Sequence, residues 1–134
     1  MKKPTIIFAD FERMDMRVGE VKDASLVKGS KNLIKFHVDL GEDYGVVEIL
    51  SGIAKWYTPE DFVGKKYVVL ANIEPKQMMG MSSNGMLLAA DSDEKPIFLV
   101  VDSNLNVNGL LKCPIFGHLN CPSFLTNKTR LIRK

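Results

Sequence analysis

The sequence has little of what disulfide-bonded, metal-binding or membrane-spanning proteins need. It contains two cysteines, two histidines and one tryptophan among 134 residues. Two thiols are too few for a disulfide framework and fit a reducing compartment. The apolar stretch near the start, Ile6–Ala9, is cut short by Asp10 and is far shorter than a signal-peptide core or a membrane span. We therefore expect a cytoplasmic protein without a membrane segment.

A large excess of charge of one sign is also missing. The formal net charge is +2, and it is unevenly distributed. Residues 1–102 carry 13 Lys and Arg against 16 Asp and Glu, whereas residues 103–134 carry 5 against none. A protein that binds polyanions through bulk charge alone would be more basic. Any binding of nucleic acid must therefore depend on a local basic patch and on specific contacts.

Candidate residues for catalysis or metal binding do not make a complete site. The segment from Gly80 to Gly85 has one residue too many for the Gly-x-Ser-x-Gly nucleophile elbow, and an apolar strand follows it where the elbow requires a helix. Cys113, His118 and Cys121 are near enough in sequence to share an ion, but a structural zinc needs a fourth protein ligand and none is close by. We predict no enzyme activity, no metal site and no cofactor.

The most regular pattern in the sequence is an alternation with a period of two. Ile34, Phe36, Val38 and Leu40 alternate with polar residues, which is typical of a strand with one buried and one solvated face. Gly19 lies inside another apolar segment and predicts a bulge or a sharp bend there. The further segments that predict strands are Met16–Leu26, Val46–Leu50, Tyr67–Ala71, Met86–Ala90 and Ile97–Val101.

Helical signals are scarce, and their position bears on the fold class. Thr58 as N-cap, Pro59 as first helical residue and Gly64 as stop predict a helix of roughly one or two turns between the third and fourth strands. The stretch FADFERMDM predicts another short turn near the N-terminus. We predict an all-β OB-fold, a five-stranded Greek-key barrel with a short helix between strands 3 and 4 and a C-terminal appendage. A β-sandwich is the alternative.

We expect one domain over residues 1–134, with its core at about residues 10–102 and an extension over residues 103–134. Within this domain, Lys28, Lys31 and Lys35 cluster where the first two strands are joined. Loops at this place in an OB barrel flank the face that binds nucleic acid. A plain solvated lysine loop is the alternative interpretation.

The segment GMSSNGMLLAA, residues 80–90, is open to two interpretations. Asn84-Gly85 is a strong signal for a two-residue hairpin turn of type I′, which would make the segment a simple connection. Four of the seven methionines nevertheless crowd into residues 78–86, and flexible thioethers suit an adaptable binding surface. Ser82 and Ser83 add short donors and acceptors for phosphate, ribose or base edges. From these residues alone, both interpretations stand.

Several motifs occur in the order and spacing of a known family. They are DFERMDMRVGEV, VDLG, SGIAKWYTPEDFVGKK, VVLANIEPKQMMGMSSNGMLLAA and FLVVD, which lie within about residues 10–102. On these motifs the chain resembles the tRNA-binding domain family, which includes dimeric tRNA-binding proteins and the C-terminal domain or β subunit of methionyl-tRNA synthetases. The resemblance implies an OB-fold that recognises the shape of tRNA, chiefly at its elbow or outer corner, without strong sequence preference.

The resemblance also implies which residues contact RNA, and it places them on one side of the barrel. Two departures stand out: Ser83 and Gln77 occupy positions where many relatives have an acidic and a basic residue, respectively, so part of the charge that grips RNA is missing. The basic residues of the extension would compensate by holding phosphates. The implied contacts are Lys28, Lys31, Asn32, Ser82 and Met86, with Arg17, Lys76 and Ser83 as additions.

The partners expected for this chain follow from the same resemblance. Relatives that stand alone dimerise, and two linked sites raise the avidity for a large ligand such as tRNA. We therefore expect a homodimer that uses the N-terminal segment and the region after Asp102, or a β subunit that joins a methionyl-tRNA synthetase and enhances tRNA capture. A chaperone-like binder of unfolded or secretory polypeptides is the alternative, because one bacterial branch that resembles the family has that role.

Overall fold

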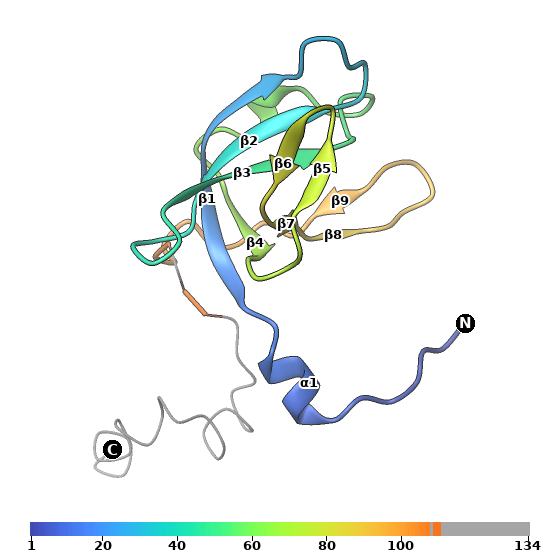
Figure 1. Cartoon of the computed structure of the whole chain (residues 1–134), viewed down its shortest axis with the longest axis vertical. Coiled ribbons are helices and arrows are strands. Elements are labelled where there is room, and N and C mark those ends of the chain that lie inside the picture. The colour runs from blue at the N-terminus through green and yellow to red at the C-terminus, as the bar shows by residue number, and fades with distance from the viewer. Residues whose placement is uncertain (108, 111–134) are drawn as a thin grey trace.

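Antiparallel strands dominate the computed structural model, which describes residues 1–107, 109 and 110 (Figure 1). A short helix precedes the first strand, and a 3-10 helix separates the third strand from the fourth. The elements in chain order are α1 (Phe8–Glu12), β1 (Met16–Leu26), β2 (Ile34–Asp39), β3 (Val46–Ser51), η1 (Pro59–Asp61), β4 (Lys66–Leu70), β5 (Lys76–Met78), β6 (Met81–Ser83), β7 (Met86–Leu87), β8 (Ala89–Ala90) and β9 (Ile97–Phe98).

Five of the strands form one sheet in the order β3-β2-β1-β4-β7, and all neighbouring pairs are antiparallel. The two outer strands of this sheet, β3 and β7, are brought together by the residues that connect β6 with β7. The Leu50 N–H donates to the Ser83 Oγ at 3.0 Å, and the Asn84 N–H donates to the Glu48 carbonyl at 2.8 Å. The sheet is thereby nearly closed into an OB-like barrel, so the predicted fold class is confirmed and the sandwich alternative is wrong.

The core follows the alternation in β2. Ile34, Phe36 and Val38 are fully buried, whereas the residues between them face outward. At one end of the core lies Phe62, immediately after η1, and its ring meets that of Phe36 at 4.8 Å between centroids. η1 begins where the capping residues predict, since the Asp61 carboxylate accepts from the Thr58 N–H at 2.8 Å.

The bulge that was expected at Gly19 lies three residues further along β1. The register between β1 and β2 shifts between Val21 and Asp23, whereas Gly19 itself pairs regularly with Tyr67. The physical reason for glycine at this position is close packing. A Cβ atom on Gly19 would lie 2.7 Å from Val38 Cγ1 and 2.9 Å from Val69 Cγ2, both of which belong to the core.

The chain after β9 continues along the barrel as far as the structure describes it. The Val101 N–H donates to the Lys66 carbonyl at 3.1 Å, and the Val18 N–H donates to the Gly109 carbonyl at 2.9 Å. Most of the expected 103–134 extension, with Cys113, His118 and Cys121, lies outside the described residues. Among the described residues, no helix is long and apolar enough to span a membrane.

We expect Gly19→Ala to lower the free energy of unfolding by about 1–3 kcal/mol, because the added methyl group overpacks the core where Val38 and Val69 meet. Urea denaturation of the two proteins measures this difference. Gly52→Ala is the matched control, since a Cβ atom there meets no atom within 4 Å. Equal stability of wild type and Gly19→Ala would show that the side chains around Gly19 adjust freely.

Candidate nucleic-acid interface

β5 and β6 form a separate hairpin that stands beside the barrel sheet (Figure 1). Met78 pairs with Met81, which leaves Met79-Gly80 as the two-residue turn. Both turn residues have positive φ, +50° and +76°, as a type I′ turn requires. The expectation that Asn84-Gly85 forms this turn is therefore wrong. Those two residues instead lead from β6 into β7.

The tip of the hairpin touches the basic loop that joins β1 to β2. A Cβ atom on Gly29 would lie 3.7 Å from the Met79 Cε. The loop is held in shape by Ser30, whose Oγ accepts from the N–H groups of Asn32 and Leu33 at 3.3 and 3.2 Å. The side chains of Lys28, Lys31 and Asn32 remain exposed. The segment with the methionines and the basic loop are thus neighbours, on one side of the barrel as the family resemblance implies.

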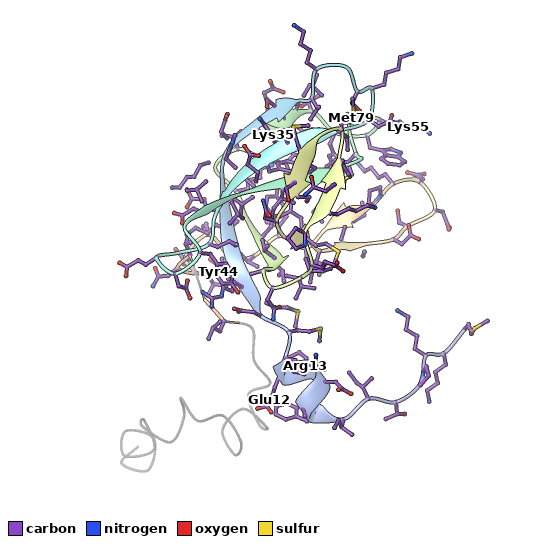
Figure 2. All side chains as sticks on the ribbon, viewed as in Figure 1. Glu12, Arg13, Lys35, Tyr44, Lys55 and Met79 are labelled. Atoms are coloured by element: carbon purple, nitrogen blue, oxygen red, sulfur yellow. The ribbon has the colours of Figure 1, made fainter. Side chains whose placement is uncertain are left out.

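A third segment also contacts the loop. The Ala54 N–H donates to the Asn32 carbonyl at 2.9 Å, which places Lys55 and Trp56 next to the basic loop. The Lys55 Nζ lies 5.4 Å from the centre of the Trp56 ring. Figure 2 shows Lys35, Lys55 and Met79 at the same end of the barrel. Lys55 lies in the SGIAKWYTPEDFVGKK motif but was not predicted as a site residue, because its proximity to Asn32 arises from a tertiary contact.

Together these segments form what we call the loop–hairpin surface. Its lysines form no ion pair with any carboxylate of the described residues. Lys35, on the outer face of β2, lies 4.0 Å from Glu48, and Lys22 is paired with Glu20 at 2.8 Å. The ammonium groups of the surface are therefore available to an external anion. The surface comprises Lys28, Lys31, Asn32, Lys55, Lys76 and Ser82 around Met79.

Residues of the hairpin lie at different distances from its tip. Ser82 pairs with Gln77 one step below the turn, is half-buried, and its Oγ donates to Asn84 Oδ1 at 3.2 Å. Lys76 is exposed at the base of the hairpin. Met86 is further away, because it pairs with Leu70 in the sheet, level with the start of β1 rather than with its end at the basic loop. The structure therefore does not bring Met86 to the loop.

Ser83 lies in the interior rather than on the surface. Its side chain is 5% exposed, and its Oγ accepts from the Leu50 N–H at 3.0 Å and donates to the Gly85 carbonyl at 3.4 Å. A hydroxyl engaged in this way has no access to a ligand outside the barrel. We therefore correct the expectation that Ser83 contacts RNA: this residue closes the barrel.

Arg17 is also buried, at the end of the barrel remote from Met79, where Figure 2 shows its neighbour Tyr44. Its guanidinium donates to Asp15 and Asp43 at 2.7 Å and stacks 4.5 Å from the centre of the Tyr44 ring. The hydrogen bond from Arg17 holds the pKa of Asp15 below its ordinary value, and the same bond raises the pKa of Arg17. Arg17 thus ties β1 to the β2–β3 turn and is not part of the loop–hairpin surface.

Comparison with known proteins links this chain to one group by sequence and by structure. A family model described as a putative tRNA-binding domain matches residues 16–108. A methionine–tRNA ligase from Methanocella arvoryzae is 50% identical over 97 residues, which are 72% of this chain and 14% of the ligase. The chain therefore spans a small part of such ligases.

Two solved structures share the fold over the full length of their chains. A MetRS-related protein from Pyrococcus horikoshii has a TM-score of 0.76 and 32% identity, and the match covers 82% of this chain and 100% of that one. The CsaA chaperone protein from Picrophilus torridus has a TM-score of 0.74 and 25% identity, with coverage of 81% and 100%.

The two neighbouring serines of β6 are expected to behave differently on substitution. Ser83→Ala leaves the buried Leu50 N–H without an acceptor and should lower the free energy of unfolding by about 1–3 kcal/mol. Ser82→Ala removes a half-exposed hydroxyl and should change stability by less than about 0.5 kcal/mol. Thermal and urea denaturation measure both values. If the two variants are equally stable, Ser83 does not close the barrel.

Proposed function

Because the chain belongs to the family of putative tRNA-binding domains, we propose that it binds tRNA through the loop–hairpin surface. The observation that carries this proposal is the convergence of three segments, far apart in sequence, on the tip of the hairpin. Each segment brings at least one exposed lysine that is not paired with a carboxylate of the described residues. A basic patch of this kind supplies the local charge that the chain as a whole lacks.

The binding mechanism is electrostatic capture followed by recognition of shape. Phosphate contacts dominate the affinity of proteins for nucleic acids, and the ammonium groups of the surface supply them. Folded RNA is then recognised through the geometry of its backbone and its 2′-hydroxyl groups. The Asn32 amide and the Ser82 hydroxyl are the short polar groups on this surface that suit such contacts. An RNA that runs along the hairpin from tip to base also reaches Lys76 and Met86.

The role proposed here is non-catalytic. The chain corresponds to 14% of the ligase that it matches, so the aminoacylation chemistry of such an enzyme is not expected from it. The residues that match the family would give a synthetase an additional binding site for tRNA. The chain would therefore act as a tRNA-capturing module, either as a homodimer or as a β subunit beside a methionyl-tRNA synthetase in the cytoplasm.

Dimerisation is supported by apolar side chains that the barrel leaves uncovered. α1 has no buried residue, and Ile6 and Ile7, just before it, are 60% and 67% exposed. In Figure 1, α1 and the N-terminal segment project away from the barrel. Leu105 and Leu110, in the region after Asp102, are also exposed. A second copy of the chain that covers these residues would remove apolar surface from water and would link two tRNA-binding surfaces.

Binding of bulk tRNA is expected to weaken steeply as salt rises, because phosphate contacts release counterions. Lys31→Gln, and likewise Lys55→Gln, should reduce the affinity about three- to tenfold and flatten the salt dependence. Fluorescence anisotropy with labelled tRNA measures both effects. Lys22→Gln is the matched control, because Lys22 lies outside the surface and is already paired with Glu20. Absent or salt-independent binding would contradict the proposal.

The oligomeric state is tested by placing a charge in the N-terminal segment. Ile7→Asp should convert a dimer into a monomer and weaken tRNA binding through lost avidity. Val63→Asp, at another exposed apolar position next to η1, should change neither. Light scattering after size-exclusion chromatography measures the mass. A monomeric wild type that forms a complex with a methionyl-tRNA synthetase lacking its own C-terminal domain would favour the β-subunit role.

A chaperone-like role is the second candidate, and the similarity to the CsaA chaperone protein supports it. The exposed Met79 and Met86 are compatible with an adaptable apolar surface. The two roles separate in one assay, the suppression of aggregation of a model substrate protein. Suppression that competing tRNA does not relieve would favour the chaperone role over RNA binding.

A further inference from the structure

A pocket of about 350 Å³ opens between the segment after β3 and the β8–β9 hairpin. Its interior is made of aromatic rings packed edge to face, since the Phe62 and Phe98 centroids are 5.1 Å apart with their planes at 89°. Trp56, which is 40% exposed, stands among the lining residues at the edge of this cluster. The aromatic lining comprises Trp56, Tyr57, Phe62, Tyr67 and Phe98.

The hydroxyl of Tyr67 is the polar group that this cluster leaves unused. The residue as a whole is only 3% exposed, and its hydroxyl forms no hydrogen bond within the described residues. Because no buried side-chain oxygen of these residues lacks a partner, the Tyr67 hydroxyl must remain accessible from outside the core. Tyr67 itself lines the pocket, together with Asp61 and Tyr57. The hydroxyl therefore faces the pocket. Burial raises the pKa of Tyr67 to about 12, so the group stays protonated and can donate. The hydroxyl of Tyr57, by contrast, already donates to the Pro96 carbonyl at 2.7 Å.

Charged side chains line the pocket beside the rings. Lys65 is exposed, and the Lys95 Nζ lies 4.9 Å from the centre of the Tyr57 ring. Asp61 also lines the pocket, but its carboxylate accepts from the Thr58 N–H, and that bond lowers its pKa. The lining of the pocket thus carries two ammonium groups and one carboxylate, and the carboxylate is already hydrogen-bonded. The net charge of these three groups is positive.

The pocket lies next to the surface proposed to bind RNA. Trp56 follows Ala54 by two residues, and the Ala54 N–H bonds to Asn32 in the basic loop. Lys55, between them, belongs to the loop–hairpin surface, and Figure 2 shows it at the same end of the barrel as Met79. An RNA strand bound across the basic loop would therefore lie next to Trp56.

We propose that this pocket accepts a single unstacked nucleotide of the bound RNA. The base lies against Trp56 and the aromatic wall, its polar edge accepts from the Tyr67 hydroxyl, and its phosphate is held by Lys65 and Lys95. Unpaired bases are commonly recognised in this way, by stacking on aromatic side chains and by hydrogen bonds to their edges. The inference rests on the proposed function for the source of the nucleotide, but the pocket can be tested without tRNA.

The experiment uses the fluorescence of Trp56, which is the single tryptophan of the chain. Titration with AMP or CMP should quench the emission to saturation. Adenosine, which lacks the phosphate, and ribose 5-phosphate, which lacks the base, should each bind about tenfold more weakly. Tyr67→Phe and Lys95→Gln should weaken AMP binding by about tenfold with the melting temperature retained, and Lys22→Gln should leave it unchanged.

The proposal that this pocket binds a nucleotide would be overturned by any of the following results: no saturable quenching by nucleotides, quenching by ribose 5-phosphate equal to that by AMP, or an AMP affinity that is unaltered in both Tyr67→Phe and Lys95→Gln. Stronger quenching by an acidic aromatic dipeptide such as Phe-Glu would likewise overturn it in favour of a peptide site. Lys31→Gln, in the basic loop, should weaken tRNA binding and leave AMP binding intact. Retained tRNA binding without AMP binding rejects the pocket alone, and AMP binding without tRNA binding rejects the proposed function alone.

Discussion

The hydrogen bonds from β3 to Ser83 and from Asn84 to β3 join the two outer strands of the sheet, and the arrangement of the candidate site depends on them. A five-stranded sheet that is left open would expose the edges of β3 and β7 to water and to other chains. The bond from the Leu50 N–H to the Ser83 Oγ satisfies a buried donor with a side chain, because β6 belongs to a separate hairpin and cannot continue the ladder. Ser83, which the sequence led us to expect on the RNA-binding face, thus holds the β5–β6 hairpin in place instead.

Closure of the barrel also determines where the hairpin points. With its base held against β3, the hairpin extends toward the β1–β2 loop, and Met79 reaches Gly29 at its tip. A methionine with positive φ is an uncommon conformation. The two-residue type I′ turn requires this conformation, and it leaves the exposed Met79 side chain with its Cε next to Gly29 of the loop.

The distribution of charge explains how a chain with a net charge of +2 can present a basic site. Some acidic residues away from the hairpin tip are paired with basic ones: Asp15 and Asp43 bind Arg17, and Glu20 binds Lys22. The lysines around the hairpin tip are not paired with any carboxylate of the described residues. The electrostatic potential at the loop–hairpin surface therefore depends on the lysines that lack a carboxylate partner there. The net charge of the whole chain is a poor guide to it.

Local patterns in the sequence were sufficient for the five strands of the barrel sheet, for the start of η1 and for the general position of the basic loop, but they did not predict β5 and β6. Alternation with a period of two decides which face of β2 is buried, and the capping residues around Thr58 decide where η1 begins, because both depend on neighbours in the chain. Long-range packing settled the rest. It placed the hairpin turn at Met79-Gly80, it buried Ser83 and Arg17, and it assembled Lys55 and the pocket around Tyr67 beside the loop. These features depend on contacts between segments distant in sequence, and no local pattern of residues encodes them.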